Sequence, residues 1–281
     1  MVGFTVFVVL IGYVLGQALG YGTSWMWIAV AISVVSSLVS YYWGDKMVLA
    51  MSGARPADRK RDFDFFTVAE NLALASGIPK PKLYVIDDTA MNAFATGRDP
   101  QHAVVCATSG ILDKLERREL EGVIAHELSH VKNYDTRLMA VVAVLVGTVA
   151  FLADMFMRSL WWGGGRDRDE DRGGNAIFLV VGIVLALVSP IVATLIQLAI
   201  SRRRELLADA SGAYLTRYPE GLARALEKLV KDKEVLEAAS NATAHLYIVN
   251  PFKGKNFGAW FSGLFDTHPP IEERIKLLRA M

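Results

Sequence analysis

Four long runs of apolar residues constrain the fold of this chain more than any other feature of its sequence. They cover residues 2–21, 25–43, 138–157 and 176–200, and the last run contains no charged residue. A helix rises about 1.5 Å per residue, so each run is long enough to cross a hydrocarbon layer of about 30 Å. Buried helices of a large soluble core are the alternative, but a globular helix of this length normally keeps a polar face. The sequence therefore predicts four transmembrane helices.

These runs divide the chain into four segments. Residues 1–43 would form an N-terminal hairpin, whose first run lacks the preceding basic residues of a cleaved signal peptide and is expected to remain as an anchor. Residues 138–200 would form a second hairpin around the loop 158–175. The polar segments 44–137 and 201–281 would then lie together on one side of the membrane and form one domain in two parts.

The distribution of lysine and arginine predicts the orientation of the chain. Basic residues near the ends of the runs are concentrated in residues 44–137 and 201–281, and fewer lie in the loop 158–175. Cytoplasmic segments carry such an excess, so we expect a multi-pass protein of the cell membrane whose polar domain is cytoplasmic.

Charge and cysteine content narrow the possible partners. The formal net charge is +1, without a basic stripe, so nucleic acid is not an expected partner. The single cysteine, Cys106, cannot form an internal disulfide. It lies in the apolar stretch AVVCAT, where we expect a small core residue rather than a reactive thiol.

The pentapeptide HELSH is a candidate metal motif. It places His126 and His130 four residues apart, so both rings lie on one face of a helix. Two neutral imidazoles suit Zn²⁺, which in catalytic sites takes three protein ligands and leaves a position for water. Glu127 lies beside the first histidine, where a carboxylate can accept a proton from the attacking water. An amphipathic helix can carry this motif by accident, so the motif alone leaves the function open.

A candidate third ligand, Glu205, lies in the stretch RRRELLADASGAYL. Asp209 follows one turn later on the same helical face, where it could accept the other ring N–H of a ligand histidine. The alternative is that Glu205 pairs with the three arginines before it. The apolar hairpin between residues 138 and 200 would return Glu205 to the side of the membrane that holds HELSH.

Together these stretches make the sequence resemble the HtpX-type membrane zinc metalloproteases, relatives of the CAAX prenyl endopeptidase in the gluzincin group. Besides the apolar runs, the resemblance is carried by PKPKLYVIDDTAMNAFATG, HAVVCATSGIL, ELEGVIAHELSHVKNYD, ELLADASGAYL and DTHPPIEERI. It implies an ATP-independent endopeptidase that hydrolyses misfolded or damaged membrane proteins. Its partners would be protein or peptide substrates and the lipid bilayer, with no nucleotide.

The resemblance also assigns roles to residues. It implies one Zn²⁺ per chain, held by His126, His130 and Glu205, with Glu127 as the general base. It further implies that a substrate-binding strand lies along the cleft. The strand would contain Asn92, Ala93 and Phe94, and the backbone of the first two would pair with the substrate. The alternating runs KLYVID, NAFATG and AVVCAT also predict an ordinary set of three short strands.

Three further residues have open roles. His268 precedes two prolines on a rigid turn. The resemblance places it near the metal, as a catalytic group that steadies the oxyanion or as an extra resting-state ligand, and a plain surface histidine is the alternative. Asn133 and Asp135 match the family pattern after the second histidine. A direct role in the site is one interpretation, and a role in ending the helix or in supporting the ligands from behind is the alternative.

The sequence thus predicts a mainly α membrane protein with four transmembrane helices. Its cytoplasmic part would be an α+β, zincin-like protease domain that contains a small antiparallel sheet. A membrane scaffold with a structural zinc is a rival in another class, although such sites usually take four ligands and often cysteines. A selective processing protease for prenylated or other membrane-associated substrates is a second rival.

Overall fold

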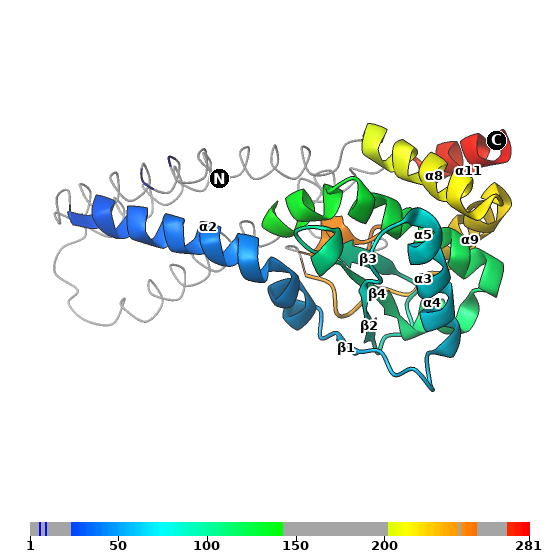
Figure 1. The fold of residues 1–281 in the computed structure, drawn as a ribbon, viewed down its shortest axis with the longest axis horizontal. Coiled ribbons are helices and arrows are strands. Elements are labelled where there is room, and N and C mark those ends of the chain that lie inside the picture. The colour runs from blue at the N-terminus through cyan, green and yellow to red at the C-terminus, as the bar shows by residue number, and fades with distance from the viewer. Residues whose placement is uncertain (1–5, 7–8, 10–23, 143–201, 241–242, 252–268) are drawn as a thin grey trace, which may run out of the picture. The chain divides into compact units, whose positions relative to one another are not determined.

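The computed structural model describes residues 6, 9, 24–142, 202–240, 243–251 and 269–281 (Figure 1). The chain divides into two compact units, Met1–Tyr42 with Leu145–Leu195, and Trp43–Val144 with Ile196–Met281. In the first unit the described residues belong mainly to helix α2 (Ser24–Met51), which continues into the second unit. The second unit contains the sheet and the other described helices.

The predicted membrane spans fall largely on residues that the structure does not describe. This applies to the runs 2–21, 138–157 and 176–200, apart from residues 6, 9 and 138–142, and to the loop 158–175. The run 25–43 lies within α2. Among the described residues, no helix combines the length and the apolar character needed to cross a membrane. The four transmembrane helices therefore stay a prediction.

Helices make up most of the described part of the second unit. They are α3 (Phe63–Ser76), α4 (Ser109–Lys114), α5 (Arg117–Lys132), α8 (Arg202–Thr216), α9 (Pro219–Lys231) and α11 (Ile271–Arg279). A further helical stretch covers residues 135–142. Two 3₁₀ turns, η1 (Pro100–His102) and η2 (Ala244–Leu246), lie in the connections.

The four strands form a mixed sheet. They are β1 (Arg55–Pro56), β2 (Lys82–Ile86), β3 (Ala93–Thr96) and β4 (Val104–Thr108), in the spatial order β1-β2-β4-β3. The predicted strands are confirmed, but the predicted antiparallel sheet is wrong, because β2 and β4 are parallel. The chain passes from β2 to the edge strand β3 and returns through η1, so β4 enters the sheet between the two.

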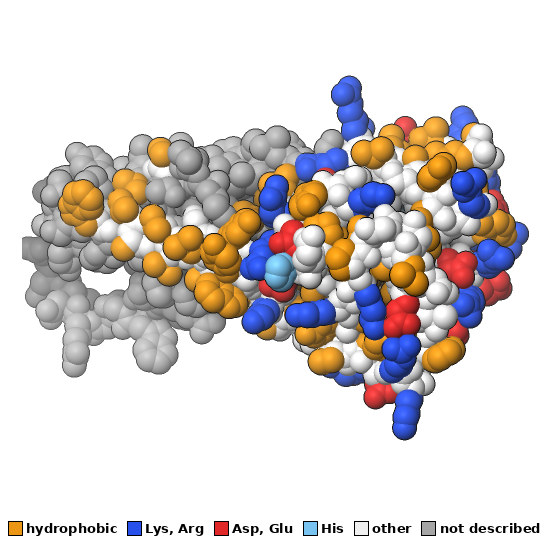
Figure 2. All heavy atoms as spheres, viewed as in Figure 1, with side chains coloured by type: hydrophobic (Ala, Val, Ile, Leu, Met, Phe, Trp, Pro, Cys, Tyr) orange, Lys and Arg blue, Asp and Glu red, His pale blue; other side chains and the backbone are white. Residues whose placement is uncertain are grey.

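Both faces of the sheet are covered, which explains why every residue of β4 is buried. Val105 and Ala107 face a hydrophobic core shared with α3, α5 and α9. Val104 and Cys106 face a second core that contains Tyr247 and the end of α2. Cys106 is fully buried, as predicted for a small core residue. At the surface, basic and acidic side chains are interspersed on the face shown in Figure 2.

Helix α5 is the central helix of this unit and packs against α3, α8, α9 and β3. A capping box starts it, in which the side chain of Glu119 accepts a hydrogen bond of 2.8 Å from the backbone N–H of Glu116. Gly122 allows α9 to approach, since a Cβ there would lie 2.6 Å from the backbone nitrogen of Leu222. The HELSH motif thus sits on the most enclosed helix of the unit.

Candidate metal centre

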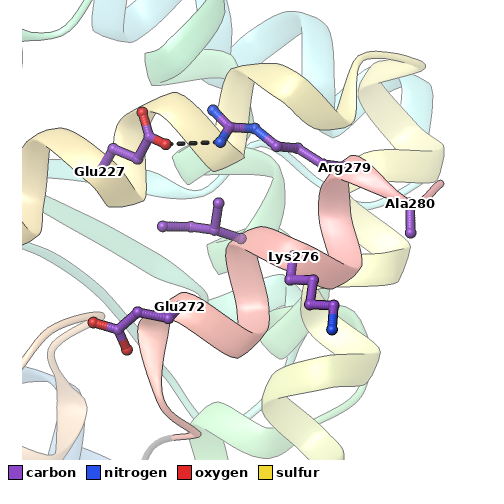
Figure 3. Close-up of a pocket in the computed structure, with 6 residues that line it drawn as sticks. Glu227, Glu272, Lys276, Arg279 and Ala280 are labelled. Atoms are coloured by element: carbon purple, nitrogen blue, oxygen red, sulfur yellow. Dashed lines mark ion pairs between the residues drawn. The ribbon is translucent and has the colours of Figure 1, made fainter.

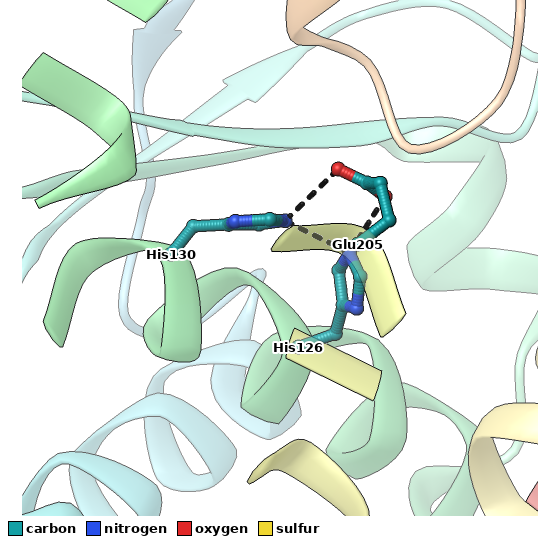
Figure 4. A group of neighbouring side chains, drawn as sticks. All are labelled: His126, His130 and Glu205. Carbon is teal, nitrogen blue, oxygen red and sulfur yellow. Dashed lines mark hydrogen bonds and ion pairs between the residues drawn. The ribbon is translucent and has the colours of Figure 1, made fainter. Parts of the chain in front are cut away.

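His126 and His130 lie one turn apart on α5, and both are almost completely buried. Their Nε2 atoms are 3.2 Å apart, and the rings are nearly perpendicular, with centroids separated by 4.7 Å. Glu205 reaches the same point from the first turn of α8 (Figure 4). Its Oε1 atom lies 3.4 Å from Nε2 of His130, and its Oε2 atom 3.7 Å from Nε2 of His126.

These distances fit one metal ion. Ligand atoms about 2.1 Å from a tetrahedral zinc ion lie roughly 3.4 Å from one another. The three residues each offer one ligand atom, all within 4.8 Å of one another. Gly212 contributes to this approach, because a Cβ at that position of α8 would lie 3.0 Å from the backbone nitrogen of His126. His126, His130 and Glu205 could therefore hold a metal ion together.

Two aspartates face the other ring nitrogens of the histidines. Asp209 on α8 places Oδ1 2.9 Å from Nδ1 of His126. Asp135 places Oδ2 3.1 Å from Nδ1 of His130. A carboxylate in this position favours the tautomer with a proton on Nδ1, which leaves the Nε2 lone pair for a metal. The structure thus brings Asp135 next to a candidate ligand, whereas Asn133 is an exposed residue at the C-terminal end of α5.

Arg274 on α11 belongs to this centre, and the sequence reasoning missed it. Its side chain is fully buried, and Nε and Nη2 each donate a hydrogen bond of 2.7 Å to the carboxylate of Asp209. Its Nη1 atom lies 3.7 Å from Oε2 of Glu205. A signal was present, because Arg274 falls on the same helical face as Ile271, Ile275 and Leu278. An arginine among apolar residues at this spacing indicates a buried, paired charge.

Carboxylates outnumber cations around the centre. Among the described residues, two guanidinium groups pair with the buried acids of the centre. Arg204 lies 3.6 Å from Asp135, and Arg274 pairs with Glu205 and Asp209. With neutral histidines, the carboxylates of Asp135, Glu205 and Asp209 exceed these two guanidinium groups by one negative charge, and Glu127 adds a second when it is ionised, which suits a divalent cation. The four buried acids are Glu127, Asp135, Glu205 and Asp209.

The pKa values reflect this excess of negative charge. Burial alone would lower the pKa of His130, but the carboxylates of Glu205 and Asp135 outweigh burial and raise the pKa to about 10. Burial opposes the ionisation of Asp209, yet the hydrogen bonds from Arg274 and the contact with His126 bring its pKa down to about 2. A positive charge is therefore strongly stabilised between these groups.

Glu127 lies beside the first histidine and is 3% exposed. Burial raises its pKa to about 7, while the backbone N–H of Ala95 donates a hydrogen bond to the carboxylate and opposes this shift. A carboxyl group with a pKa near neutrality can both accept and release a proton.

The predicted substrate-binding residues lie at the edge of the sheet, but they already have partners. The carbonyl of Ala93 accepts a hydrogen bond of 3.0 Å from the N–H of Ile248. Asn92 donates a side-chain hydrogen bond of 2.9 Å to the carbonyl of Val249. Phe94 is fully buried in the second core, on the face of the sheet opposite to Ala93, and its ring packs against Tyr247. His268 lies outside the described residues.

A wider hollow than the cavity at this centre lies elsewhere on the unit. A shallow depression of about 510 Å³ lies between α9 and α11, bordered by charged residues of both signs (Figure 3). Arg279 and Glu227 form an ion pair of 2.9 Å at its rim. It contains neither histidine nor cysteine, so the candidate chemistry lies in the much smaller cavity at His126, His130 and Glu205.

Comparison with known proteins agrees with this geometry. The family model described as Peptidase family M48 matches residues 60–281. The chain is 44% identical to the Protease HtpX homolog of Caldanaerobacter subterraneus over 280 residues, which are 99% of this chain and 92% of the relative. It is 50% identical to the Protease HtpX homolog of Dictyoglomus thermophilum over 246 residues, 86% of this chain and 78% of the relative.

A solved structure shares the fold. The crystal structure of S. mikatae Ste24p aligns with a TM-score of 0.52 at 18% identity, over 99% of this chain and 63% of that chain. This similarity concerns the fold alone. The family model and the two relatives, however, cover most of the chain at high identity. The chain therefore belongs to peptidase family M48 and is a metalloprotease.

Proposed function

We propose that the chain is a membrane-bound zinc endopeptidase that hydrolyses peptide bonds in misfolded or damaged membrane proteins. One observation supports zinc above all: two imidazole nitrogens and a carboxylate converge in a buried position at tetrahedral spacing. Two histidines and one glutamate form a known ligand set of catalytic zinc, and three protein ligands leave a position for water.

Each residue of the centre then has a role. Zinc, when bound, supplies Lewis-acid activation of water and of the scissile carbonyl. Glu127 accepts the proton of the attacking water and passes it to the nitrogen of the leaving amine. Its pKa of about 7 suits both transfers. Asp209 and Asp135 hold the two rings in orientation, and Arg274 keeps Asp209 ionised.

The edge strand β3 is the proposed binding place for the substrate. Ala95 lines the cavity together with Glu127, and its N–H points toward that carboxylate. An extended peptide that pairs with β3 would bring its backbone past the ligands, whatever its side chains. In this proposal the roles of Asn92 and Ala93 in pairing, and of His268 near the oxyanion, stay predictions from the sequence.

The membrane location rests on the four apolar runs and the distribution of basic residues. In this proposal residues 1–43 and 138–200 are the two membrane hairpins. Residues 44–137 and 201–281 form the cytoplasmic protease domain, which places the centre where unfolded parts of membrane proteins emerge from the bilayer.

Glu127→Gln tests the proposed function. The full chain, purified in detergent, is compared with this variant and with Glu121→Gln, a matched change at a partly exposed position of the same helix. We expect one zinc per chain in all three proteins and hydrolysis of an unfolded substrate by the wild type and Glu121→Gln alone. Full activity of Glu127→Gln would refute the proposed role of Glu127 as the general base. A wild-type protein that retains no zinc would refute the proposed zinc site.

A further inference from the structure

The segment Leu246–Val249, here called the strap, lies over the candidate centre. It follows α9 in the sequence, and all four of its residues are buried, with exposed fractions of 7% or less. The segment before it is fixed at its base. Asp232 accepts a hydrogen bond of 2.7 Å from the N–H of Met91, and Asp88 accepts one of 3.0 Å from the N–H of Glu237.

The strap is bound to the outer edge of β3. Among the described strands, β3 is the last in the sheet and pairs with β4 on one side. On its other side Ile248 donates its N–H to the carbonyl of Ala93 at 3.0 Å. The side chain of Asn92 donates to the carbonyl of Val249 at 2.9 Å and accepts from its N–H at 3.4 Å. The first of these is a main-chain contact of the kind that an added strand makes with a sheet edge, and the other two use the side chain of Asn92.

The strap also closes the cavity at the metal ligands. Leu246, Tyr247 and Ile248 line it together with the three candidate ligands, Glu127 and Ala95. The space that is left measures about 10 Å³. This is room for on the order of one water molecule. A peptide strand needs about 4.8 Å beside its neighbour in a sheet, so substrate and strap cannot lie on β3 together.

We propose that the strap is an internal competitor, which occupies the place of the substrate on β3 and must be displaced before hydrolysis. This inference rests on the proposed function. A tethered segment competes at an effective concentration on the order of millimolar, so weakly binding peptides are excluded. The strap reads Leu-Tyr-Ile-Val, so this edge of β3 accommodates an apolar segment with aromatic and β-branched residues. Substrates of the same kind, which folded proteins rarely expose, would compete best.

Displacement of the strap would exchange one set of contacts for another. Among the described residues its main-chain hydrogen bond to β3 is the one from Ile248 to Ala93, which an incoming strand can replace, and two more bonds join Val249 to the side chain of Asn92. The ring of Tyr247 packs on Phe94 with centroids 5.2 Å apart, and its hydroxyl donates to Ser52 at 3.4 Å. All four residues of the strap are buried, so a competing peptide must bury apolar side chains of its own in their place.

Hydrogen exchange on the inactive Glu127→Gln protein tests the proposal directly. The probe is an unfolded apolar peptide containing Leu-Tyr-Ile-Val, and its binding is followed separately by fluorescence anisotropy. We expect saturating peptide to increase exchange in residues 243–251 and to decrease it in β3. Bound peptide with unchanged protection of residues 243–251 would overturn the strap proposal. Absence of binding would instead overturn the proposed substrate site, and with it the strap.

A strap variant gives a second measurement. Ile248→Pro removes the N–H that bonds Ala93, and the preceding Tyr247 already has the extended backbone that a following proline requires. We expect unchanged zinc content and a roughly fivefold higher kcat/KM on a short peptide, the factor that one net hydrogen bond is worth. Ile248→Val keeps the N–H and is the matched control. Equal or lower kcat/KM in a zinc-loaded Ile248→Pro protein would contradict the proposal.

Discussion

Arg274 and Asp209 form a buried, two-pronged ion pair, with both hydrogen bonds 2.7 Å long, although they lie 65 residues apart in the sequence. The pair connects α11 to α8. Asp209 in turn faces Nδ1 of His126 on α5, so three helices meet through three side chains. Asp209 can therefore serve the histidine only if α11 is in place. This couples the folding of the C-terminal helix to the geometry of the metal centre.

Replacing Arg274 should weaken metal binding and stability together. Arg274→Ala would leave the carboxylate of Asp209 buried without its cation, which typically costs about 3–5 kcal/mol. Loss of a group that orients a ligand from behind usually lowers metal affinity by roughly 10–100-fold. The measurements are thermal unfolding and a zinc competition titration with a chelator.

Arg279→Ala is the control for that prediction. It removes a partly exposed arginine of the same helix that pairs with Glu220 and Glu227 at the surface, so we expect little change in either quantity. Equal effects of the two substitutions would mean that Arg274 acts only by holding α11 in place.

Asp135 and Asn133 should behave differently, although the sequence treats them alike. Asp135→Asn keeps the size of the side chain but removes the charge that faces Nδ1 of His130 and pairs with Arg204. We expect a loss of zinc affinity of roughly 10–100-fold. Asn133→Ala changes an exposed residue at the end of α5 and should leave zinc affinity unchanged. A titration that finds the two variants equally impaired would contradict this assignment.

The thiol of Cys106 should be unreactive in the folded protein. Burial raises its pKa above the usual range of a cysteine, and the side chain is fully enclosed in the second core of the sheet, with Tyr247 and the end of α2. We expect an aromatic disulfide reagent to modify it only after denaturation, with one thiol per chain released then. Rapid modification at neutral pH in the native, detergent-solubilised protein would show that the sheet opens readily.

The sequence predicts local parts of the centre better than distant ones. The spacing of His126 and His130 within one helix is a local property, and the structure places both rings on one face as expected. Glu205 and Asp209 share a turn of α8, so their common face was also predictable. Arg274 reaches them only through the packing of α11, and periodicity within α11 reveals that it is buried but not what it binds.

In the sheet, too, the local features were predictable from the sequence and the long-range arrangement was not. Alternation of residues locates β2, β3 and β4, because it depends on each strand alone. It does not predict that β4 inserts between the other two, since strand order depends on the path of the connections. The strap was missed for a related reason. Leu246–Val249 is a short apolar segment whose meaning comes only from its position on β3.

Removal of the metal should destabilise the catalytic unit. Without a cation, a proton on His130, whose pKa is raised to about 10, compensates part of the negative charge of the buried acids, but it does not tie α5 to α8 as a shared metal ion would. A ligand that binds only the folded state stabilises it by about 4 kcal/mol when present at roughly 1,000 times its dissociation constant. We therefore expect a chelator to lower the Tm by several degrees and added zinc to restore it. Above pH 7, where Glu127 is mostly ionised, Glu127→Gln removes one negative charge without removing a ligand, so chelation should lower the Tm of this variant less than that of the wild type. A chelated wild type that melts at the same temperature as the zinc-loaded protein would show that the centre is not a metal site.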